Sequence, residues 1–502
     1  MPLEVAAGEL SATDRVAQPR GNGWQAVLGR LLSFPVLLAA GLAVITFFTV
    51  STRFYDPDLW WHLKVGQIIA ATHSIPSTDI FSYTTHQHAW TAHEWLAQLM
   101  MYGVYAAAGY RGLMLWLAVL ASAIFILVYV RCWRQCHNPL LAFLGGMFAW
   151  LFGTVGLAVR PLIFGYCFLA VELLLVELAL SGKRRCLWFL PPLFALWANC
   201  HGSYYFGLAV LGVYWLCSQI QGNWGFLVSE KSSRQLRNTL GAILLLCTVA
   251  ICCNPVGVRL LIYPFDALFH QTASMNSIDE WLPADLRSLR GVGMLGAFLG
   301  ICLLGCWRRS ELRLREFLLT LMVFGMAVQH SRMLFLFGLI VSPILCRLAA
   351  PLMPAHRDLN RPLANAVLLC GAIAAIVAAF PSAAAIERQI RHQGPADAVD
   401  YIRRAHLAGP MLNSYGFGGY LIWTLPEEKV FIDGRGDVFD WTGVLAEYGR
   451  WATLQADPNE LLQKYHIRFC LLEKDAPMAR VMPYLPGWHL AYSDAAAVIF
   501  AR

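Results

Sequence analysis

The chain carries few charged residues for its length. Only 14% of its 502 residues are Asp, Glu, Lys or Arg, whereas 58% are hydrophobic. A soluble domain carries roughly a quarter charged residues, so this composition excludes a typical soluble protein and predicts a polytopic α-helical membrane protein. The formal net charge of +7 does not predict nucleic-acid binding, because the basic residues lie in short clusters between apolar runs and not in one patch.

Common catalytic and cofactor motifs are also missing. The 14 cysteines include no CxxC pair, and the sequence has no P-loop, GxGxxG or Ser-His-Asp spacing. His93-Glu94 does not continue into a zinc-protease motif, because position 97 is Ala where the second histidine is needed. Only Cys470 lies in the long polar region near the C-terminus, so a disulfide framework is excluded there. A cleavable signal peptide is not expected, because residues 1–30 precede the first apolar run.

Apolar runs of membrane-spanning length recur along most of the chain. The first, 31–50, has about the length that a helix needs to cross the bilayer core, roughly 20 residues. Further spans are expected at 95–108 leading into 113–130, and at 139–158, 162–180, 187–200, 203–220, 239–253, 291–307, 316–329, 333–348 and 363–380. Together these runs predict about eleven transmembrane helices within a transmembrane domain at 31–380.

Basic residues between the spans predict their orientation. The clusters that fall on one side lie at 183–185, 231–237, 308–315 and 347–361. Lys and Arg are enriched in cytoplasmic loops, so we expect the N-terminus inside, with 1–30 as a flexible cytoplasmic tail, and the C-terminus outside.

Residues 381–502 are expected to form an extracytoplasmic α/β domain. Helices are expected at 396–404 and 458–465, and strands at 410–413, 429–433, 467–472 and 495–501. Helices that alternate with short strands are typical of small α/β domains. Two Gly-containing stretches, 413–423 and 433–437, fit either a ligand contact or a structural turn.

The first outer loop, 51–95, holds carboxylates where a membrane helix would emerge. Aromatic residues favour the membrane interface, but that preference does not explain Asp56, Asp58 and Glu94. Asp56 before Pro57 fits a helix cap, with a helix running to about residue 70, whereas Asp58 has no comparable structural explanation. We predict that Asp56, Asp58 and Glu94 are catalytic. Asp56 or Asp58 would be a general base, or the two would bind a divalent cation such as Mg²⁺ or Mn²⁺.

Polar residues of the other outer loops are expected to join this loop. They are Arg160, Asn199, His201, Glu280, His330 and Arg332, and the first loop adds His62 and His93. Polar turns and headgroup contacts explain each residue alone, whereas their gathering at one face favours a substrate-binding site. The two arginines, with His201 and His330, would suit a phosphate group as positive side chains. Glu172 and Glu177 are expected to pair within the bundle, with an ion path as the alternative.

These features resemble the GT-C superfamily of integral-membrane glycosyltransferases. The likeness rests on many membrane helices, an acidic motif soon after the first of them, matched here by Asp56 and Asp58, and an outer C-terminal α/β domain. The stretches DPDLWWHL, HEWL, WANCHG and GGYLIW followed by FIDGR are similar to those of a group of bacterial membrane proteins. Oligosaccharyltransferases of the superfamily carry an acidic WWDYG motif. The nearest match here, 415–420, has no acid, so sequon recognition is not implied.

The resemblance implies a hexosyl or pentosyl transferase in the bacterial cytoplasmic membrane. Such an enzyme, surrounded by membrane lipid, would move a sugar from a polyprenyl-phosphate-linked donor to a glycan, lipid or protein acceptor at the outer face. Two other functions stay open: a transporter or lipid flippase, and a non-enzymatic envelope assembly protein. A transporter needs ionisable residues along a path through both leaflets, whereas most of them here gather at the outer end.

The predicted topology is testable with reporter fusions. Fusions after residue 50, after residue 185 and at the C-terminus are expected to report outside, inside and outside, because basic clusters hold their loops in the cytoplasm. Alkaline phosphatase and a fluorescent protein give opposite readouts at each point. A C-terminal fusion that reads inside would contradict the orientation.

Overall fold

The structure is a computed structural model of the chain. It describes residues 23–52, 54–270, 273–274, 279–307, 312–354 and 360–502. Most of the predicted N-terminal tail lies outside these ranges, as does part of the basic cluster at 308–315. The described end of the tail, Gly23–Leu31, is helix α1, so this part of the tail is helical and not a flexible chain.

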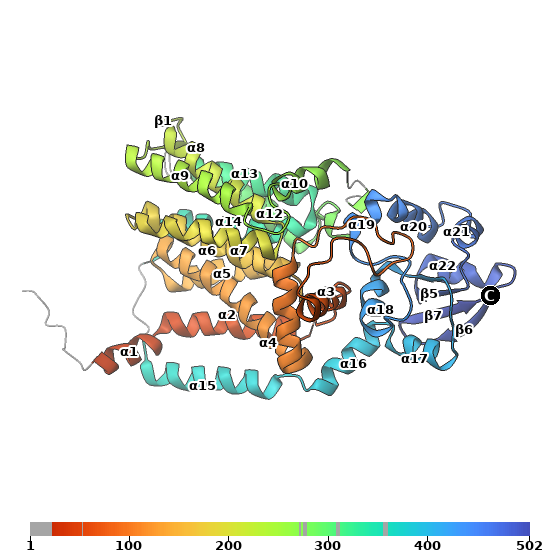
Figure 1. Cartoon of the computed structure of the whole chain (residues 1–502). Helices are drawn as coiled ribbons and strands as arrows, with labels where there is room; N and C mark the ends of the chain where they lie inside the picture. Colours follow the sequence, from red (N-terminus) through yellow and green to blue (C-terminus); the bar gives the residue numbers. More distant parts are fainter. Residues whose placement is uncertain (1–22, 53, 271–272, 275–278, 308–311, 355–359) are drawn as a thin grey trace, which may run out of the picture.

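Helices from residues 34–379 form a bundle (Figure 1). Its members are α2 (Phe34–Ser51), α4 (Trp95–Cys136), α5 (Pro139–Gly153), α6 (Leu162–Leu180), α7 (Leu190–Cys200), α8 (Tyr204–Gln219), α9 (Arg234–Ile251), α12 (Leu289–Trp307), α13 (Leu314–Gln329), α14 (Leu334–Ala349) and α15 (Pro362–Ala379). Every predicted span coincides with one of them.

Six helical stretches in the described part of the chain are long and apolar enough to cross a membrane. They are α2, α4, α6, α12, α15 and Ser331–Leu352, which includes α14. The chain is therefore an integral membrane protein. The other bundle helices are shorter or more polar, so the count of about eleven spans stays a prediction.

Helix α4 is the central element of the bundle. It packs against α2, α3, α5, α6 and α14. Gly109 interrupts its helical geometry with φ 58° and ψ −156°. Residues that carry a Cβ rarely adopt this conformation. The kink lets residues 95–108 lie along the end of the bundle before the chain turns into it, as the two apolar runs in the sequence predict.

The first outer loop contains a helix, α3 (Leu59–Thr72), which packs between α4 and α18 (Gly418–Thr424). The predicted helix cap at Asp56 is two residues too early, because the helix begins at Leu59 and not at Pro57. The Asp56 side chain accepts a hydrogen bond from the backbone N–H of Asp58 (Oδ1 to N, 2.9 Å), which holds a turn ahead of the helix. Asp58 therefore occupies the N-cap position.

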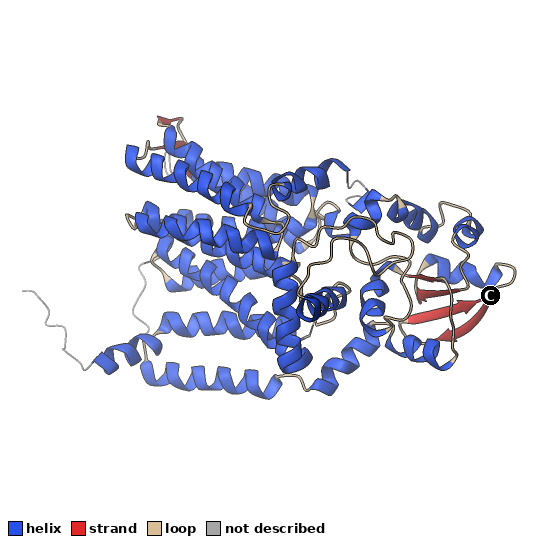
Figure 2. Cartoon of the chain, viewed as in Figure 1, coloured by secondary structure: helices blue, strands red, loops and turns tan. Residues whose placement is uncertain are grey.

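The C-terminal segment contains a four-stranded sheet with the order β4-β5-β7-β6. Strand β4 (Met411–Asn413) is parallel to β5 (Phe469–Glu473), and β7 (Ala497–Ala501) is antiparallel to both β5 and β6 (His489–Ser493). The helices around it are α16 (Ala383–Gln393), α17 (Ala396–Arg404), α18, α19 (Gly436–Trp441), α20 (Val444–Ala452), α21 (Pro458–Lys464) and α22 (Pro477–Val481). Figure 2 shows this sheet at one end of the molecule, beyond the bundle.

The strand predicted at 429–433 is not part of this sheet. Its backbone pairs instead with the first outer loop, where Val430 N–H donates to Phe81 O (3.1 Å) and Tyr83 N–H donates to Val430 O (3.2 Å). A second, smaller sheet of β1 (Gly222–Asn223), β2 (Leu227–Ser229) and β3 (Leu312–Arg313) lies at the opposite end of the bundle in Figure 1. The 429–433 segment thus joins loop and C-terminal segment.

A buried arginine completes that junction. The Arg435 side chain has no exposed surface, and its Nη2 lies 2.7 Å from Asp79 Oδ1 and 2.7 Å from Asp433 Oδ2. The rings of Phe81 and Trp90 are each 4.9 Å from its guanidinium carbon. Asp79 and both rings belong to the first outer loop, so one residue of the C-terminal segment ties that loop in place.

Replacing this arginine is expected to destabilise the protein strongly. Arg435→Met leaves two buried carboxylates without a counter-charge, which costs about 3–5 kcal/mol in comparable buried pairs. Arg391→Met is the matched control, because its partners Asp397 and Asp400 are half exposed and such pairs contribute about 0–1 kcal/mol. Thermal unfolding in detergent measures both; equal falls in melting temperature would show that Arg435 is no stronger a joint than a surface pair.

Candidate functional site

A cavity of about 310 Å³ lies between the helix bundle and the C-terminal segment. Its walls come from the first outer loop and α3, the turn between α5 and α6, the end of α7, the 3-10 helices η2 (Asp279–Trp281) and η3 (Ser331–Met333), and two C-terminal stretches around 415 and 434–437. In Figure 2 the loops that cross from the bundle toward the sheet run through this region. The cavity is thus assembled from segments that lie far apart in the sequence.

Most of the predicted site residues line this cavity. They are Asp58, His62, His93, Glu94, Arg160, His201, Glu280 and Arg332. Asp56, Asn199 and His330 do not line it and lie behind it, where they hold residues that do.

Arg160 is the electrostatic centre of one wall. Its Nε lies 2.6 Å from Asp56 Oδ2, and its Nη1 lies 2.8 Å from Glu280 Oε1 and 3.3 Å from Asp58 Oδ2. Burial lowers the pKa of Arg160, but the three carboxylates raise it by more, and the net shift is upward. The guanidinium therefore stays charged, and Asp56 serves to position it.

Asp58 lines the cavity, and each of its two carboxylate oxygens has a partner. Its Oδ1 accepts a hydrogen bond from Trp61 Nε1 (3.1 Å), and its Oδ2 faces Arg160. Burial raises the pKa of Asp58 to about 6, against the opposing effect of Arg160. A Cβ on Gly434 would lie 1.7 Å from Asp58 Oδ1, so only glycine lets the C-terminal segment approach this carboxylate.

The predicted metal ligands do not fit a divalent cation as they are placed. The guanidinium of Arg160 occupies the space between Asp56, Asp58 and Glu280, and its nitrogens lie within 3.3 Å of all three carboxylates. Within the described ranges, no group of three or more His, Cys, Asp and Glu side chains is arranged to hold a metal ion. The chemistry of this wall is that of an arginine shared by carboxylates.

Glu94 lies in the cavity among three histidines. His201 Nε2 is 3.4 Å from its Oε1, His62 Nδ1 is 3.8 Å from its Oε2, and His93 Nε2 is 3.9 Å from its Oε1. Burial, with the charges of Asp437 and Asp58, raises the pKa of Glu94 to about 8. Glu94 is therefore mostly protonated at neutral pH.

The three histidines are neutral at the same pH. Burial lowers the pKa of His62, His93 and His201 below the ordinary value of 6.5. His201 was predicted as a positive phosphate ligand, and its burial makes it an uncharged donor or acceptor instead. Positive charge in the cavity comes from the arginines.

Hydrogen bonds indicate which ring nitrogens carry protons. The backbone N–H of Ser203 donates to His201 Nδ1 (3.0 Å), so His201 Nε2 carries the proton and faces Glu94. His93 Nδ1 donates to Thr91 O (3.2 Å), which leaves His93 Nε2 as an acceptor toward Glu94. Glu94 Oε1 therefore faces both a ring N–H that can donate, on His201, and a ring nitrogen that can accept, on His93.

Asn199 and His330 have structural partners. Asn199 Oδ1 accepts from Trp95 Nε1 (2.7 Å), and its Nδ2 donates to the carbonyl oxygens of Ala195 and Cys253 (2.8 Å each). This arrangement fixes the start of α4, next to Glu94.

His330 supports the neighbouring arginine in the same way. Its Nδ1 donates to Trp281 O (2.6 Å), and the Trp281 ring lies 4.4 Å below the guanidinium carbon of Arg332. Among the residues that the structure describes, Arg332 forms no ion pair. It is thus a positioned cation with its charge available.

One acidic residue of the cavity escaped the sequence analysis. Asp437, at the start of α19, lines the cavity and accepts a hydrogen bond from the Tyr263 hydroxyl (3.1 Å). Burial raises its pKa, and His93 opposes the shift. Within the stretch 433–437, Asp433 pairs with Arg435, whereas Asp437 faces the cavity. The predicted ligand contact of this stretch stays a prediction.

No protein family model and no curated protein matches the chain. Among solved structures, it is similar to the archaeal oligosaccharyltransferase AglB from Archaeoglobus fulgidus, in complex with an inhibitory peptide and a dolichol-phosphate, with a TM-score of 0.49 and 10% sequence identity. The alignment covers 90% of this chain and 69% of that chain.

The raised pKa of Glu94 predicts a pH-dependent stability. The pKa rises from 4.5 to about 8 on folding, so the folded state holds this proton more tightly than the unfolded state. The stability that it contributes is fully present below about pH 4.5 and is lost as the pH rises through about 8. Glu94→Gln removes the titration, so the melting temperature of the variant minus that of wild type should increase from about pH 5 to about pH 8.

The subtraction cancels the histidine titrations that both proteins share. Glu460→Gln, at an exposed position, is the control and should show no such trend. A difference for Glu94→Gln that stays constant with pH would show that Glu94 titrates normally.

Proposed function

We propose that the protein is a GT-C-type glycosyltransferase that moves a sugar from a polyprenyl-phosphate-linked donor to an acceptor hydroxyl at the outer face of the membrane. The observation that carries the proposal is the meeting of Asp58 and Glu94 with Arg160 and Arg332 in one cavity. A proton acceptor beside phosphate-binding cations is what transfer away from a phosphate requires.

Asp58 is the general base in this mechanism. It lines the cavity, its side chain is 18% exposed, and its raised pKa still leaves it ionised at neutral pH. Asp56 is less suitable, because its carboxylate is bonded to Arg160 and lies behind the wall. Asp58 takes the proton of the acceptor hydroxyl while the acceptor oxygen attacks the anomeric carbon from the face opposite the leaving phosphate.

Arg332 receives the leaving group. The bond between the anomeric carbon and the phosphate oxygen breaks, and its electron pair stays on the phosphate, which leaves as polyprenyl phosphate. Arg332 lies on Trp281 and has no carboxylate partner in the part of the chain that the structure describes, so it is the cation best placed to bind the added charge. Preorganised donors of this kind stabilise developing charge in a site that excludes water. The sugar configuration is inverted.

Glu94 holds a proton near the reacting groups. Its protonated carboxyl adds no negative charge where a phosphate must bind, and its hydrogen can be donated to a substrate oxygen. The neutral histidines around it keep this state, because an imidazolium within 4 Å would favour the ionised carboxylate. Glu94 thus acts as a hydrogen-bond donor and not as the base.

The setting of the reaction follows from the position of the cavity. It lies at the end of the apolar helices, where a lipid-linked donor in the bilayer and a glycan, lipid or protein acceptor outside it can both reach it. We infer the orientation from the basic clusters, with the C-terminal segment extracytoplasmic in a bacterial cytoplasmic membrane.

The test compares lipid-linked sugars and envelope glycans in a deletion strain that carries wild-type protein or variants. Asp58→Asn keeps the shape of the side chain and removes its basicity, so transfer should fall roughly a hundredfold or more. The donor lipid should then accumulate and one envelope glycan should be lost, as in the deletion strain itself.

Asp285→Asn is the matched control, because this aspartate is exposed and outside the cavity. It should restore the glycan fully. If Asp58→Asn restores it as well, Asp58 is not the base. If the deletion changes only the sidedness of the donor lipid and no glycan, a flippase replaces the transferase.

A further inference from the structure

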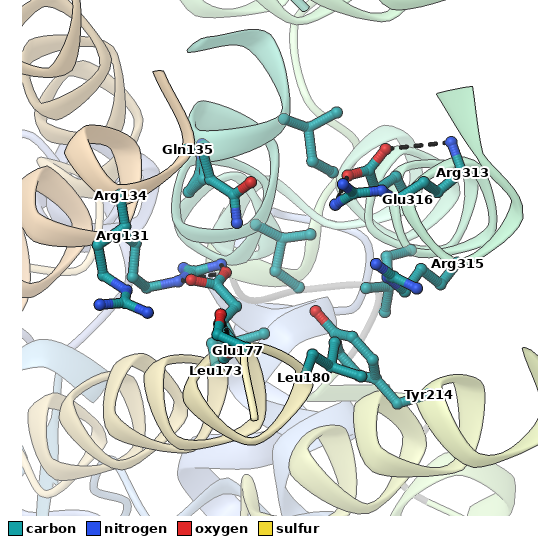
Figure 3. Close-up of a pocket in the computed structure, with 15 residues that line it drawn as sticks. Arg131, Arg134, Gln135, Leu173, Glu177, Leu180, Tyr214, Arg313, Arg315 and Glu316 are labelled. Carbon is teal, nitrogen blue, oxygen red and sulfur yellow. Dashed lines mark hydrogen bonds and ion pairs between the residues drawn. The ribbon is translucent and has the colours of Figure 1, made fainter. Parts of the chain in front are cut away.

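A second pocket, of about 210 Å³, lies at the end of the bundle away from the candidate site (Figure 3). Helix α6 connects the two: Leu162 lines the first cavity, and Glu177, fifteen positions later, lines the second. At 1.5 Å per residue that separation is roughly 22 Å. The end of α4, the start of α13 and the last turns of α14 complete the pocket.

Arginines dominate its polar lining. Arg131, Arg134, Arg313 and Arg315 face two carboxylates, Glu177 and Glu316. The lining therefore carries two more positive than negative charges. Figure 3 shows these side chains around a common space, with the Tyr214 ring on the lower side.

Two ion pairs form the fixed part of the pocket. Arg131 binds Glu177 Oε1 through Nε (3.0 Å) and Nη2 (2.8 Å), and its Nη1 donates to Leu339 O (2.7 Å). Arg347 binds Glu316 through Nε (2.9 Å) and Nη2 (2.5 Å). These pairs also confirm the expectation for Glu177, which pairs within the bundle. The same expectation is wrong for Glu172, whose two carboxylate oxygens are buried without a hydrogen-bond partner among the described residues.

Two further arginines of the lining are not paired with a carboxylate in the described part of the chain. Arg134 and Arg315 line the pocket and form no hydrogen bond or ion pair among the described residues. Glu177 Oε2 is also buried without a hydrogen-bond partner, so the pocket offers both donors and one acceptor. A phosphate ester with a hydroxyl nearby satisfies both.

A topology signal alone does not explain this arrangement. Arginines that only contact headgroups stay at the surface, whereas the Arg131 side chain is 3% exposed. Burying an ion pair costs several kcal/mol of desolvation per ion in general, so such a pair is a costly way to mark a cytoplasmic loop. The buried pair does, however, place rigid side chains next to Arg134 and Arg315.

The remaining wall is apolar. It consists of Leu173, Leu180, Leu319, Ile340 and Ile344. An amphiphile with an anionic head fits such a lining, because the head meets the arginines and its apolar continuation meets the leucines. A small soluble phosphate ester uses the arginines alone.

We propose that this pocket binds a phosphate group at the membrane face opposite the candidate active site. The phosphate is bound by Arg134 and Arg315, with Arg313 at the rim, and its source is either an anionic lipid headgroup or a soluble phosphate ester. The binding does not depend on the transfer reaction.

The test uses the full chain purified in neutral detergent. It is titrated with inorganic phosphate, or with mixed micelles that contain phosphatidylglycerol or zwitterionic phosphatidylcholine, while the apparent melting temperature is followed. The double variant Arg134→Gln with Arg315→Gln should lower the apparent affinity for the anionic probe at least about tenfold, because charge-assisted hydrogen bonds to phosphate are lost.

The matched control is Arg185→Gln with Arg234→Gln, which removes the same charge from exposed positions in the predicted cytoplasmic loops. It should bind like wild type. Saturation by phosphatidylglycerol but not phosphate assigns a lipid headgroup, and saturation by inorganic phosphate assigns a soluble ester. No saturation by either probe, or equal affinities in the two double variants, would overturn the site.

Discussion

The structure depends on one buried charge, that of Arg435. A guanidinium without solvent contact must keep its carboxylates, since losing one leaves an uncompensated charge in a medium that solvates it poorly. Asp79 comes from the first outer loop and Asp433 from the C-terminal segment, so the two parts cannot separate without breaking the pair. Both contribute walls to the cavity that holds Asp58 and Glu94. The joint therefore fixes the geometry of the site from outside it.

Inside the cavity, protonation decides what the polar side chains can do. Arg160 is committed to three carboxylates, which leaves little of its charge for a ligand. Glu94 keeps a proton because it is buried among neutral imidazoles. As a result Arg332, stacked on Trp281, is the cation whose field is least cancelled. The proposed mechanism therefore assigns the donor phosphate to Arg332 and the acceptor hydroxyl to Asp58.

Local patterns in the sequence predicted much of this and failed where the answer lies in distant neighbours. Apolar runs located the bundle helices, and 396–404 is helix α17 as expected. The apolar stretch 429–433 has a strand's composition, yet it pairs with residues 81–83, more than three hundred positions earlier. Burial makes His201 neutral, and the hydrogen bond from Tyr263 holds Asp437 at the cavity. Both effects depend on distant segments, so the spacing of residues in the sequence does not reveal them.

Arginines at the end of the bundle away from the candidate site lie in two different environments. A cluster of arginines after a span predicts a cytoplasmic loop, and Arg185 and Arg234 are exposed as that reading requires. Arg131 follows the same pattern in the sequence but is buried and paired with Glu177. Topology requires only that positive charge stay on one side, and an exposed lysine would serve. A pair in which Nε and Nη2 both donate to one oxygen of a fixed carboxylate requires the planar guanidinium. Burial and pairing, which appear only after folding, therefore separate a binding pocket from a loop that marks the membrane side.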